Sequence, residues 1–544
     1  MIAHRTNKVL LRSLARPLSS LAYPKENRIP RATNENIPNF DAKHCRPHKN
    51  KTVPELLQSL IVFQVIQIQP LVQHGETIVN TMRTVFGDTI TDSLIRNTFF
   101  PQFCGGENHD QIVNKISELK GLGINSILDY AAEDEGSGAS ASAHTTVNGE
   151  AVSQPAREYD YESEEKCDGH VEIFRRCIQT VHDAGNGRQF AAMKVTGLGN
   201  PKLLQKMSTA VRHIQAVVNF HDTQKKGHLD KEEILRVARS LSDDNDMIAR
   251  LVDHLDPTAS CVDYVDLSTA AFALDFSSPN DIFADIIPNS LKFTTEEIDL
   301  IHTLRGRANT IAKEAADLNV SLLIDAEQSW FQPAIDVIAV GLQQTYNNVE
   351  TTTKPIIFST HQCYMKDSLD RLQVDVKRSQ RLSYHFGSKL VRGAYMHKER
   401  ARASDLGYAD PIHDTVQDTH DCYDGALEYL LREVKSNDFP TIEVMCASHN
   451  RESIEKAIEL CNELGLAARA NDNLSFAQLF GMSDDLTIPL GERGYNVYKY
   501  LPYGEIKEVI PYMLRRAQEN GDVLGKSKYE MKLVIDELKE RIKM

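Results

Sequence analysis

The chain lacks long hydrophobic runs and paired cysteines. Among its 544 residues, no uninterrupted apolar stretch approaches the roughly 20 residues that a membrane-spanning helix needs. The best candidate, residues 56–72, is interrupted by several glutamines and by Pro70. The nine cysteines are odd in number and scattered, and none form a C-x-x-C pair. Neither a disulfide framework nor a zinc site is therefore predicted, and a reducing compartment fits better.

Positive charge is also scarce. Lys and Arg number 61 against 76 Asp and Glu, and a formal net charge of −15 argues against binding to nucleic acid. The first 25 residues are the exception, because no acid precedes Glu26 while Arg and Lys recur at helical spacing among leucines. Residues 1–25 are therefore predicted to be a mitochondrial transit peptide, with a disordered basic tail as the alternative.

The remaining composition, 41% apolar and 25% charged, is that of a soluble globular protein. Residues 50–122 carry apolar side chains at helical spacing and are predicted to form an N-terminal helical arm. Its apolar segment 56–72 could contact lipid or pack against the rest of the protein. Residues 133–165, rich in Ser, Gly, Asp and Glu, are predicted to form a mobile acidic loop, and residues 526–544 a C-terminal helix.

Strand-like runs alternate with longer helical segments through the rest of the chain. Eight strand candidates are present, at residues 124–130, 190–195, 321–324, 355–359, 389–394, 441–446, 474–480 and 495–500. Such alternation predicts an α/β fold with a parallel sheet, and eight units predict a (βα)8 TIM-type barrel. The barrel would comprise residues 124–204 and 291–525.

The predicted insertion, residues 205–290, contains a degenerate EF-hand loop. The segment from Asp222 to Glu233 has the first Asp, the turn Gly, the apolar eighth residue and the final Glu of such a loop. Gln224 and Lys226 stand where oxygen ligands should be, and a second candidate around Asp256 matches less well. We therefore expect a helical scaffold, with no metal site and with calcium binding unlikely.

Active sites of barrels form at the carboxyl ends of the strands, so polar residues there are the first candidates. Five such residues end or follow the predicted strands: Lys194, Asp325, Glu327, Gln362 and His449. Each alone could be a buried structural group, but together they point into one mouth. A dinucleotide fingerprint is not supported, because Lys202 replaces the third glycine after Gly197-Leu-Gly199.

The last predicted barrel helix carries an unusual polar face. Tyr512, Arg515, Arg516 and Glu519 lie at i, i+3, i+4 and i+7, so they share one side of the helix. Two guanidinium groups suit an anionic substrate, because they bind carboxylates bidentately, and the acid would balance the charge. A solvated surface network is the alternative. The residues alone therefore predict a barrel enzyme that acts on a small carboxylate.

Four ordered motifs carry a family resemblance. They are Lys389-Leu-Val-Arg392-Gly-Ala-Tyr395, Ala447-Ser-His449-Asn, Leu479-Phe-Gly481-Met, and Tyr500-Leu-Pro-Tyr503-Gly-Glu followed by Pro511-Tyr512-Met-Leu-Arg515-Arg516-Ala-Gln-Glu519-Asn520. From about residue 124 to 521, apart from the insertion, the chain resembles the proline dehydrogenase family, and closely its mitochondrial form. The resemblance implies a distorted (βα)8 barrel that holds FAD without a Rossmann domain, with the last helix over the barrel mouth.

The resemblance also implies roles for individual residues. Those that would bind proline, line its ring pocket or close the site are Lys194, Asp325, Tyr395, Leu479, Tyr500, Tyr512, Arg515, Arg516 and Glu133. Those that match FAD contacts are Gln362, Lys389, Val391, Gly393, Ala447, His449 and Glu519. The chain departs from bacterial relatives at two positions, because they have Arg at Lys389, near the flavin N5, and an aromatic residue at Met396.

The implied reaction is FAD-dependent oxidation of L-proline to 1-pyrroline-5-carboxylate. Hydride would pass from C5 of proline to flavin N5, and electrons would go on to membrane ubiquinone. The protein would then lie in the mitochondrial matrix, peripheral to the inner membrane. Three alternatives stay open: a hydroxyproline dehydrogenase, although such relatives tend to have a smaller residue at Tyr500; a colourless Schiff-base enzyme using Lys194; and a calcium-responsive scaffold without flavin.

Overall fold

A computed structural model describes residues 37–41, 45–130, 146–147, 150–151, 163–184, 188–241, 261–273, 288–436, 440–466, 473–522 and 526–543. The predicted transit peptide, Glu133 and the second EF-hand candidate lie outside these residues. So does most of the predicted acidic loop, in which β2 (Thr146–Val147) and β3 (Glu150–Ala151) pair antiparallel.

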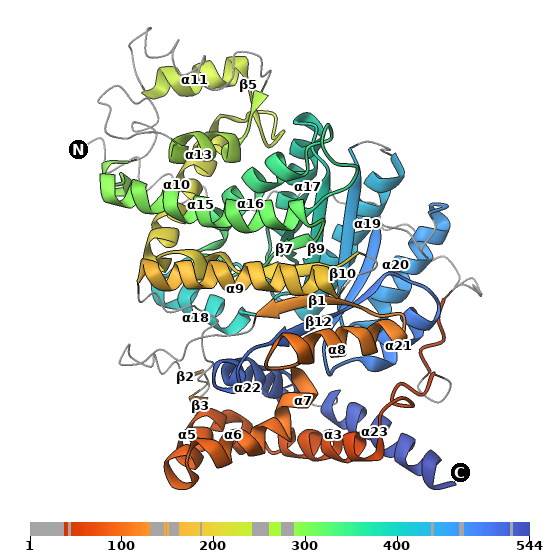
Figure 1. Ribbon diagram of the computed structural model, residues 1–544. Helices are drawn as coiled ribbons and strands as arrows, with labels where there is room; N and C mark the ends of the chain where they lie inside the picture. The colour runs from red at the N-terminus through yellow and green to blue at the C-terminus, as the bar shows by residue number, and fades with distance from the viewer. Residues whose placement is uncertain are drawn as a thin grey trace.

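Eight parallel strands close into a barrel, which confirms the predicted fold (Figure 1). They are β1 (Asn125–Tyr130), β4 (Phe190–Met193), β7 (Ser321–Ile324), β8 (Ile357–Gln362), β9 (Phe386–Val391), β10 (Ile442–Ala447), β11 (Leu474–Leu479) and β12 (Val497–Tyr503). The predicted bounds of β9 are wrong, because the strand begins at Phe386 and ends before Gly393, whose φ of +137° strands rarely adopt. β8 and β12 likewise end three residues later than predicted, at Gln362 and Tyr503.

The barrel interior is filled with side chains rather than open. A buried cluster occupies it, formed by Ile127, Phe190, Ala192, Leu323, Phe358, Met445, Ala477 and Tyr498. The ring of Phe358 takes the space beside β9, where a Cβ on Gly387 would lie only 2.7 Å from it. Glycine is therefore required at this position of β9, and the core is packed as in other small barrels.

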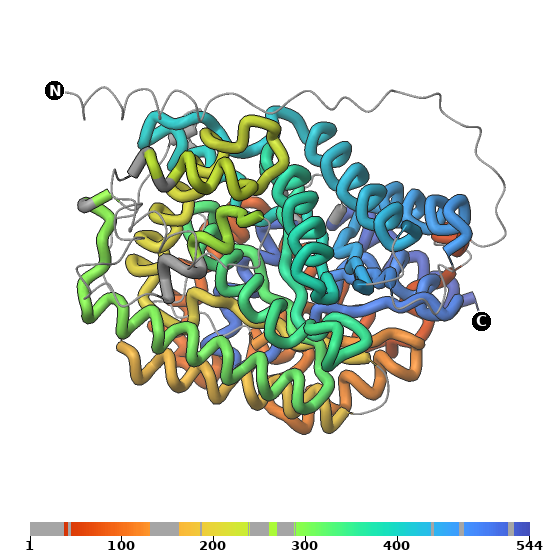
Figure 2. Tube along the Cα trace, turned by 90° about the horizontal axis from the view of Figure 1, so that it is seen from above, coloured from red at the N-terminus to blue at the C-terminus, as the bar shows by residue number. Residues whose placement is uncertain are grey.

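Helices form an outer wall around the strands, as Figure 2 shows from above. They are α8 (His109–Gly121), α9 (Glu164–Asp183), α10 (Pro201–His221), α15 (Thr295–Asp317), α16 (Gln332–Tyr346), α17 (Ser368–Arg381), α18 (Met396–Leu406), α19 (Val416–Ser436), α20 (Arg451–Glu463) and α21 (Asp484–Glu492). Short 3-10 turns lie after β4, at η1 (Val195–Leu198), and before α15, at η2 (Asn289–Leu291). The apolar faces of the outer helices pack on the outside of the strands in one large core.

The N-terminal arm forms a separate layer beneath the barrel (Figure 1). It consists of α3 (Val53–Ile66), α4 (Gln69–Gln73), α5 (Gly75–Phe86), α6 (Asp88–Arg96) and α7 (Phe99–Phe103), and it packs with α22 (Ile506–Asp522) and α23 (Lys526–Lys543). Thr52 and Glu55 form a capping box that starts α3. A second apolar cluster joins the arm to α22, so the arm buttresses the helix over the barrel mouth. Among the described residues, no helix has both the length and the apolar character to cross a bilayer.

The insertion emerges from the end of α10 and is tied to the barrel. It contains β5 (Leu229–Asp230), α11 (Lys231–Leu241), β6 (Cys261–Val262) and α13 (Tyr264–Ala273), and β5 pairs antiparallel with β6. The Lys226 ammonium lies 2.8 Å from both Asp230 and Glu233, inside the loop where a cation would sit. Asp263 forms an ion pair of 2.5 Å with Arg378 on α17, and both side chains are buried.

Candidate active site

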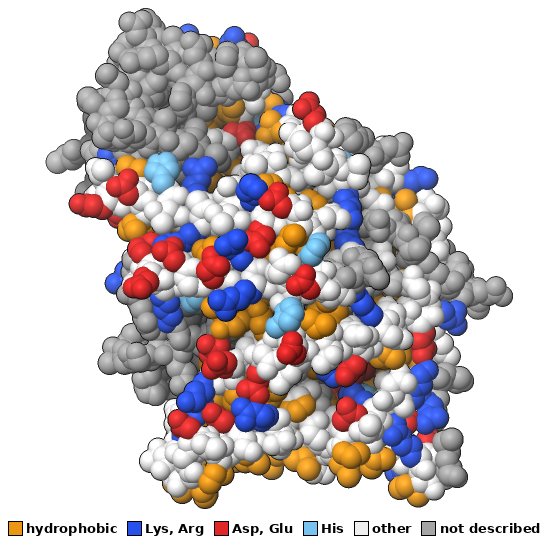
Figure 3. All heavy atoms as spheres, in the orientation of Figure 1, with side chains coloured by type: hydrophobic (Ala, Val, Ile, Leu, Met, Phe, Trp, Pro, Cys, Tyr) orange, Lys and Arg blue, Asp and Glu red, His pale blue; other side chains and the backbone are white. Residues whose placement is uncertain are grey.

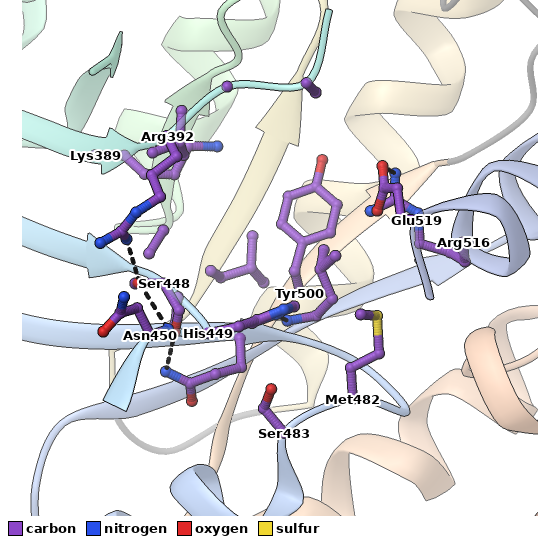
Figure 4. Close-up of a pocket in the computed structure, with 18 of the residues that line it drawn as sticks. Lys389, Arg392, Ser448, His449, Asn450, Met482, Ser483, Tyr500, Arg516 and Glu519 are labelled. Carbon is purple, nitrogen blue, oxygen red and sulfur yellow. Dashed lines mark hydrogen bonds and ion pairs between the residues drawn. The ribbon is translucent and has the colours of Figure 1, made fainter. Parts of the chain in front are cut away.

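A cavity of about 850 Å³ opens at the carboxyl ends of the barrel strands (Figure 4). Each of the eight strands, or the residue directly after it, contributes to its wall, and α22 covers it. All fifteen predicted site residues that the structure describes line it: Lys194, Gln362, Lys389, Val391, Gly393, Asp325, Tyr395, Ala447, His449, Leu479, Tyr500, Tyr512, Arg515, Arg516 and Glu519. The structure therefore brings them together, while their individual roles stay predictions.

Buried charges of alternating sign form a row along one wall of the cavity. The Lys194 ammonium lies 2.9 Å from Asp129 and 3.6 Å from Asp325, and the Lys389 ammonium lies 2.5 Å from the other oxygen of Asp325. The Tyr500 hydroxyl donates a hydrogen bond of 2.8 Å to Asp325. Two carboxylates and two ammonium groups thus neutralise one another, as buried charges must.

Asp325 is held as a carboxylate. Burial alone would raise the pKa of this group, but Lys389 and then Lys194 outweigh burial and lower the pKa to about 2. A group with so low a pKa is a poor acceptor for an ammonium proton at neutral pH. Asp325 is therefore suited to orient Lys389 and Tyr500 and not to act as a general base.

Glu327 has the opposite character. It is buried behind the cavity wall, where burial raises its pKa to about 7 against the hydrogen bonds from Thr196. Its backbone oxygen accepts a hydrogen bond of 2.8 Å from the Gln362 side chain. The sequence predicts Glu327 at the mouth of the barrel, but it does not line the cavity. Its backbone instead fixes the orientation of the Gln362 side chain.

The polar face of α22 points into the cavity. Arg515 and Arg516 are both buried, and Arg516 lies 2.5 Å from Glu519 and 5.1 Å from the ring centroid of Tyr512. The opposite face packs in the second apolar cluster through Val509, Ile510 and Met513. The burial of both arginines rules out the solvated surface network considered as an alternative.

On the other side of the cavity, His449 accepts a hydrogen bond of 2.9 Å on Nε2 from the Leu479 N–H. In the neutral imidazole the proton then lies on Nδ1. Figure 4 shows Tyr500 between this side, with Lys389 and His449, and the Arg516–Glu519 pair. The strand-end residues Lys389 and His449 and the α22 residues Arg516 and Glu519 thus line different sides of one cavity.

These groups fit a flavin together with a small carboxylate. The volume is in the range of about 300 to 1,000 Å³ found for sites of drug-sized ligands. The buried Tyr512 hydroxyl has no hydrogen-bond partner among the described residues, so a ligand atom could satisfy it. Gln362, Lys389 and His449 offer polar contacts between the apolar residues Val391 and Ala447, a mixture that suits a flat heterocycle with polar edges.

Some cavity residues escaped the sequence prediction. Asp129 ends β1 and pairs with Lys194, so the rule that selected Lys194 could also have found it. Ser448 accepts a hydrogen bond of 2.7 Å from Arg392, and both line the cavity within motifs that the sequence already singled out. Met482 also belongs to one of these motifs, whereas Ser483 carried no signal beyond its position after that motif. Gly481 has φ +76°, and a Cβ there would lie 1.7 Å from the backbone oxygen of Gln102.

Comparison with known proteins agrees with this geometry. A family model described as proline dehydrogenase matches residues 112–529. The chain is 33% identical to Proline dehydrogenase 1, mitochondrial, of Homo sapiens, over 91% of this chain and 88% of the human protein. It is 32% identical to the Drosophila melanogaster protein of the same name, over 91% of this chain and 79% of the relative. Hydroxyproline dehydrogenase of Bos taurus is 28% identical, over 90% and 91%.

Solved structures share the fold. Proline utilization A (PutA) of Bdellovibrio bacteriovorus matches with a TM-score of 0.53 and 14% identity, over 90% of this chain. The match covers 40% of that structure, so this chain spans about two fifths of its length. At this identity the likeness supports the barrel alone. The resemblance read from the four motifs is confirmed by the family model and by relatives matched over most of their length, and the chain belongs to the proline dehydrogenase family.

Proposed function

We propose that this protein oxidises L-proline to 1-pyrroline-5-carboxylate with a non-covalently bound FAD and passes the electrons to ubiquinone. Family membership supports the proposal, and one observation carries it: two buried arginines of α22 face a cavity that has room for a flavin. Two guanidinium groups on one buried helix face are suited to bind a substrate carboxylate bidentately.

The residues of this chain would bind and orient the substrate. Arg515 and Arg516 would hold the proline carboxylate, and Tyr395, Leu479 and Tyr512 would enclose its ring. FAD, when bound, supplies the hydride acceptor. Gln362, Lys389 and His449 would hold it, and the ion pair with Asp325 would fix the position of the Lys389 ammonium.

Proline must lose its extra ammonium proton before C5 can give up a hydride. Asp325 is unsuited to take that proton, because its pKa is lowered to about 2 by Lys389 and Lys194 against the effect of burial. We therefore infer that the enzyme selects proline as the free amine. The KM for total proline should fall as pH rises toward the pKa of the substrate ammonium group.

The Schiff-base alternative is disfavoured by the surroundings of Lys194. An ammonium that is paired with Asp129 at 2.9 Å and with Asp325 at 3.6 Å has no lone pair with which to attack a carbonyl. Tyr500 favours proline over hydroxyproline, because its ring stands in the cavity and its hydroxyl is held by Asp325. Steady-state rates with the two substrates should differ in favour of proline.

The experiment is a spectroscopic titration of the purified protein. It should be yellow, its flavin absorbance should bleach when L-proline is added without oxygen, and heating should release soluble FAD. A colourless protein, or a yellow one that proline does not bleach, would refute the proposal. Flavin that stays with the precipitated chain would refute non-covalent binding.

We also propose that the protein is mitochondrial. Relatives of this chain are named mitochondrial, and residues 1–25 have the composition of a transit peptide. Fused to a fluorescent protein, residues 1–25 should direct it to the mitochondrial matrix. The same segment with Arg5, Arg12 and Arg16 changed to Glu is the matched control, and equal targeting by both would contradict the assignment.

A further inference from the structure

One side of α3 is apolar and exposed. Residues 56–75 contain no Asp, Glu, Lys or Arg, although a quarter of the chain is charged. Val53, Leu57 and Ile61 follow one another at i, i+4 and i+8, which is one face of α3, and Ile68 is exposed in the turn that follows; we call these four residues the α3 face. The opposite side of α3, with Leu56, Val62, Phe63 and Ile66, is buried in the cluster shared with α22. α3 therefore uses one face for packing and leaves the other uncovered.

The hairpin of α5 and α6 extends this surface. Val85, Phe86, Ile90 and Leu94 project from it, and together with the four residues of the α3 face they are between 45% and 66% exposed. Arg83 and Asp92 lie nearby, but they form an ion pair of 3.1 Å. Figure 3 shows hydrophobic side chains along the lower edge of the molecule, over these helices. We call these eight residues the arm face.

A lysine-rich face lies on the neighbouring helix. α23 packs beside α3, and its exposed residues Lys528, Lys532, Lys539 and Lys543 fall at i, i+4, i+11 and i+15, again one helix side. The two exposed carboxylates on the described part of α23, Asp536 and Glu540, form ion pairs with Lys539 and Lys543. The local excess of positive charge is therefore at Lys528 and Lys532, in a chain whose net charge is −15.

We propose that the arm face and the lysine face of α23 together dock this protein onto a lipid bilayer that contains anionic lipids. Apolar helix faces flanked by lysines are the pattern of helices that lie in the interface plane of a membrane. The buried side of α3 keeps the helix attached to α22, so it would lie on the bilayer and not enter it end-on. A second copy of the chain would match the apolar residues but would set lysines against lysines.

The docked orientation has a use for the active site. The arm packs directly on α22, so the bilayer would lie one helix layer from the residues that cover the cavity. An acceptor dissolved in the lipid would then meet the protein close to its redox centre. This benefit rests on the proposed quinone acceptor, whereas the docking itself does not.

Vesicle flotation of the full chain tests the surface. All variants are built on a background with Arg12→Glu and Arg16→Glu, because residues 1–25 are basic and could bind lipid themselves. The probes are vesicles of phosphatidylcholine alone and of an equimolar mixture with phosphatidylserine. Leu57→Asp with Ile61→Asp and Phe86→Asp should lower binding to both vesicles at least about tenfold, because each side chain loses apolar burial.

Two further variants make the test specific. Lys528→Glu with Lys532→Glu should lower binding to the mixed vesicles at least about tenfold and leave binding to phosphatidylcholine unchanged. Leu406→Asp with Val416→Asp is the matched control, since these residues are as exposed but lie on α18 and at the start of α19. It should bind as the background chain does. Proline oxidation with a soluble dye should be equal in all variants.

Three results would overturn the proposal. The first is that the arm-face variant binds vesicles as well as the background chain does. The second is that the control variant loses as much binding as the arm-face variant. The third is a background chain that is a dimer without lipid and becomes a 61.2 kDa monomer with the arm-face substitutions while neither binds vesicles, because a second copy would then be the occupant. Failure of dye-linked activity in every variant would refute the proposed function but not the docking surface.

Discussion

Arg516→Met tests the substrate assignment most directly. The wild-type guanidinium is buried, lies 2.5 Å from Glu519 and stacks at 5.1 Å from the Tyr512 ring centroid. Methionine keeps much of the apolar volume and removes the charge. The Glu519 side chain is 40% exposed, so water can solvate it once its partner is gone. The substitution should therefore mainly weaken binding of the proline carboxylate, by about 1.5 to 3 kcal/mol. This corresponds to a rise in KM for proline of roughly ten- to a hundredfold.

The assay compares proline with pyrrolidine, which has the same ring but no carboxylate. The variant should lose affinity for proline and keep that of the wild type for pyrrolidine, while flavin content changes little. Arg516→Lys is the control for charge without the bidentate fork, and it should fall between the two. Equal losses with both substrates would mean that Arg516 acts through the fold or the flavin, and the carboxylate assignment would be wrong.

Three other predictions concern charge. Burial raises the pKa of Glu327 to about 7, so the stability contributed by its proton is complete below about pH 4.3 and declines as pH rises toward 7. In the Glu327→Gln variant, Tm should therefore depend less on pH between these values, and a dependence equal to that of the wild type would contradict the burial argument. Asp325→Asn leaves Lys194 and Lys389 without their shared carboxylate, so it should lower the free energy of unfolding by about 3 to 5 kcal/mol, as measured by urea titration. A loss below about 1 kcal/mol would mean that these ion pairs are solvated. Millimolar calcium should leave the wild-type Tm unchanged because the Lys226 ammonium contacts Asp230 and Glu233, while Lys226→Met should lower the Tm; a calcium-dependent rise in the wild type would overturn the scaffold interpretation.

The barrel could be predicted because strands buried on both faces read as apolar runs between turn residues. The run Ser321–Ile324 is a strand with the predicted bounds. β9 was offset because its first residues include Gly387, which has low strand propensity and is present only to make room for Phe358. A local pattern cannot reveal a contact between two strands that are far apart in the sequence.

The same limit applies to the site. Helical spacing was enough to group Arg515, Arg516 and Glu519, because neighbours on one helix face are set by geometry. It could not show that these arginines are buried, since that depends on the arm packed behind α22. Nor could it show that Asp129 is the carboxylate 2.9 Å from Lys194.

The ion pair between Asp263 and Arg378 bears on how the protein unfolds. The two residues are separated by 115 positions, one in the insertion and one on α17, and both are buried. If the insertion opened by itself, the buried Arg378 guanidinium would keep Asp375, 2.7 Å away on the same helix, but would lose Asp263, at a cost of about 1.5 to 3 kcal/mol for a charge-assisted hydrogen bond. Local opening is therefore suppressed, and the insertion and the barrel form one cooperative unit. Proteolysis or hydrogen exchange in the segment around β6 should follow the global unfolding of the barrel and not the fraying of a loop.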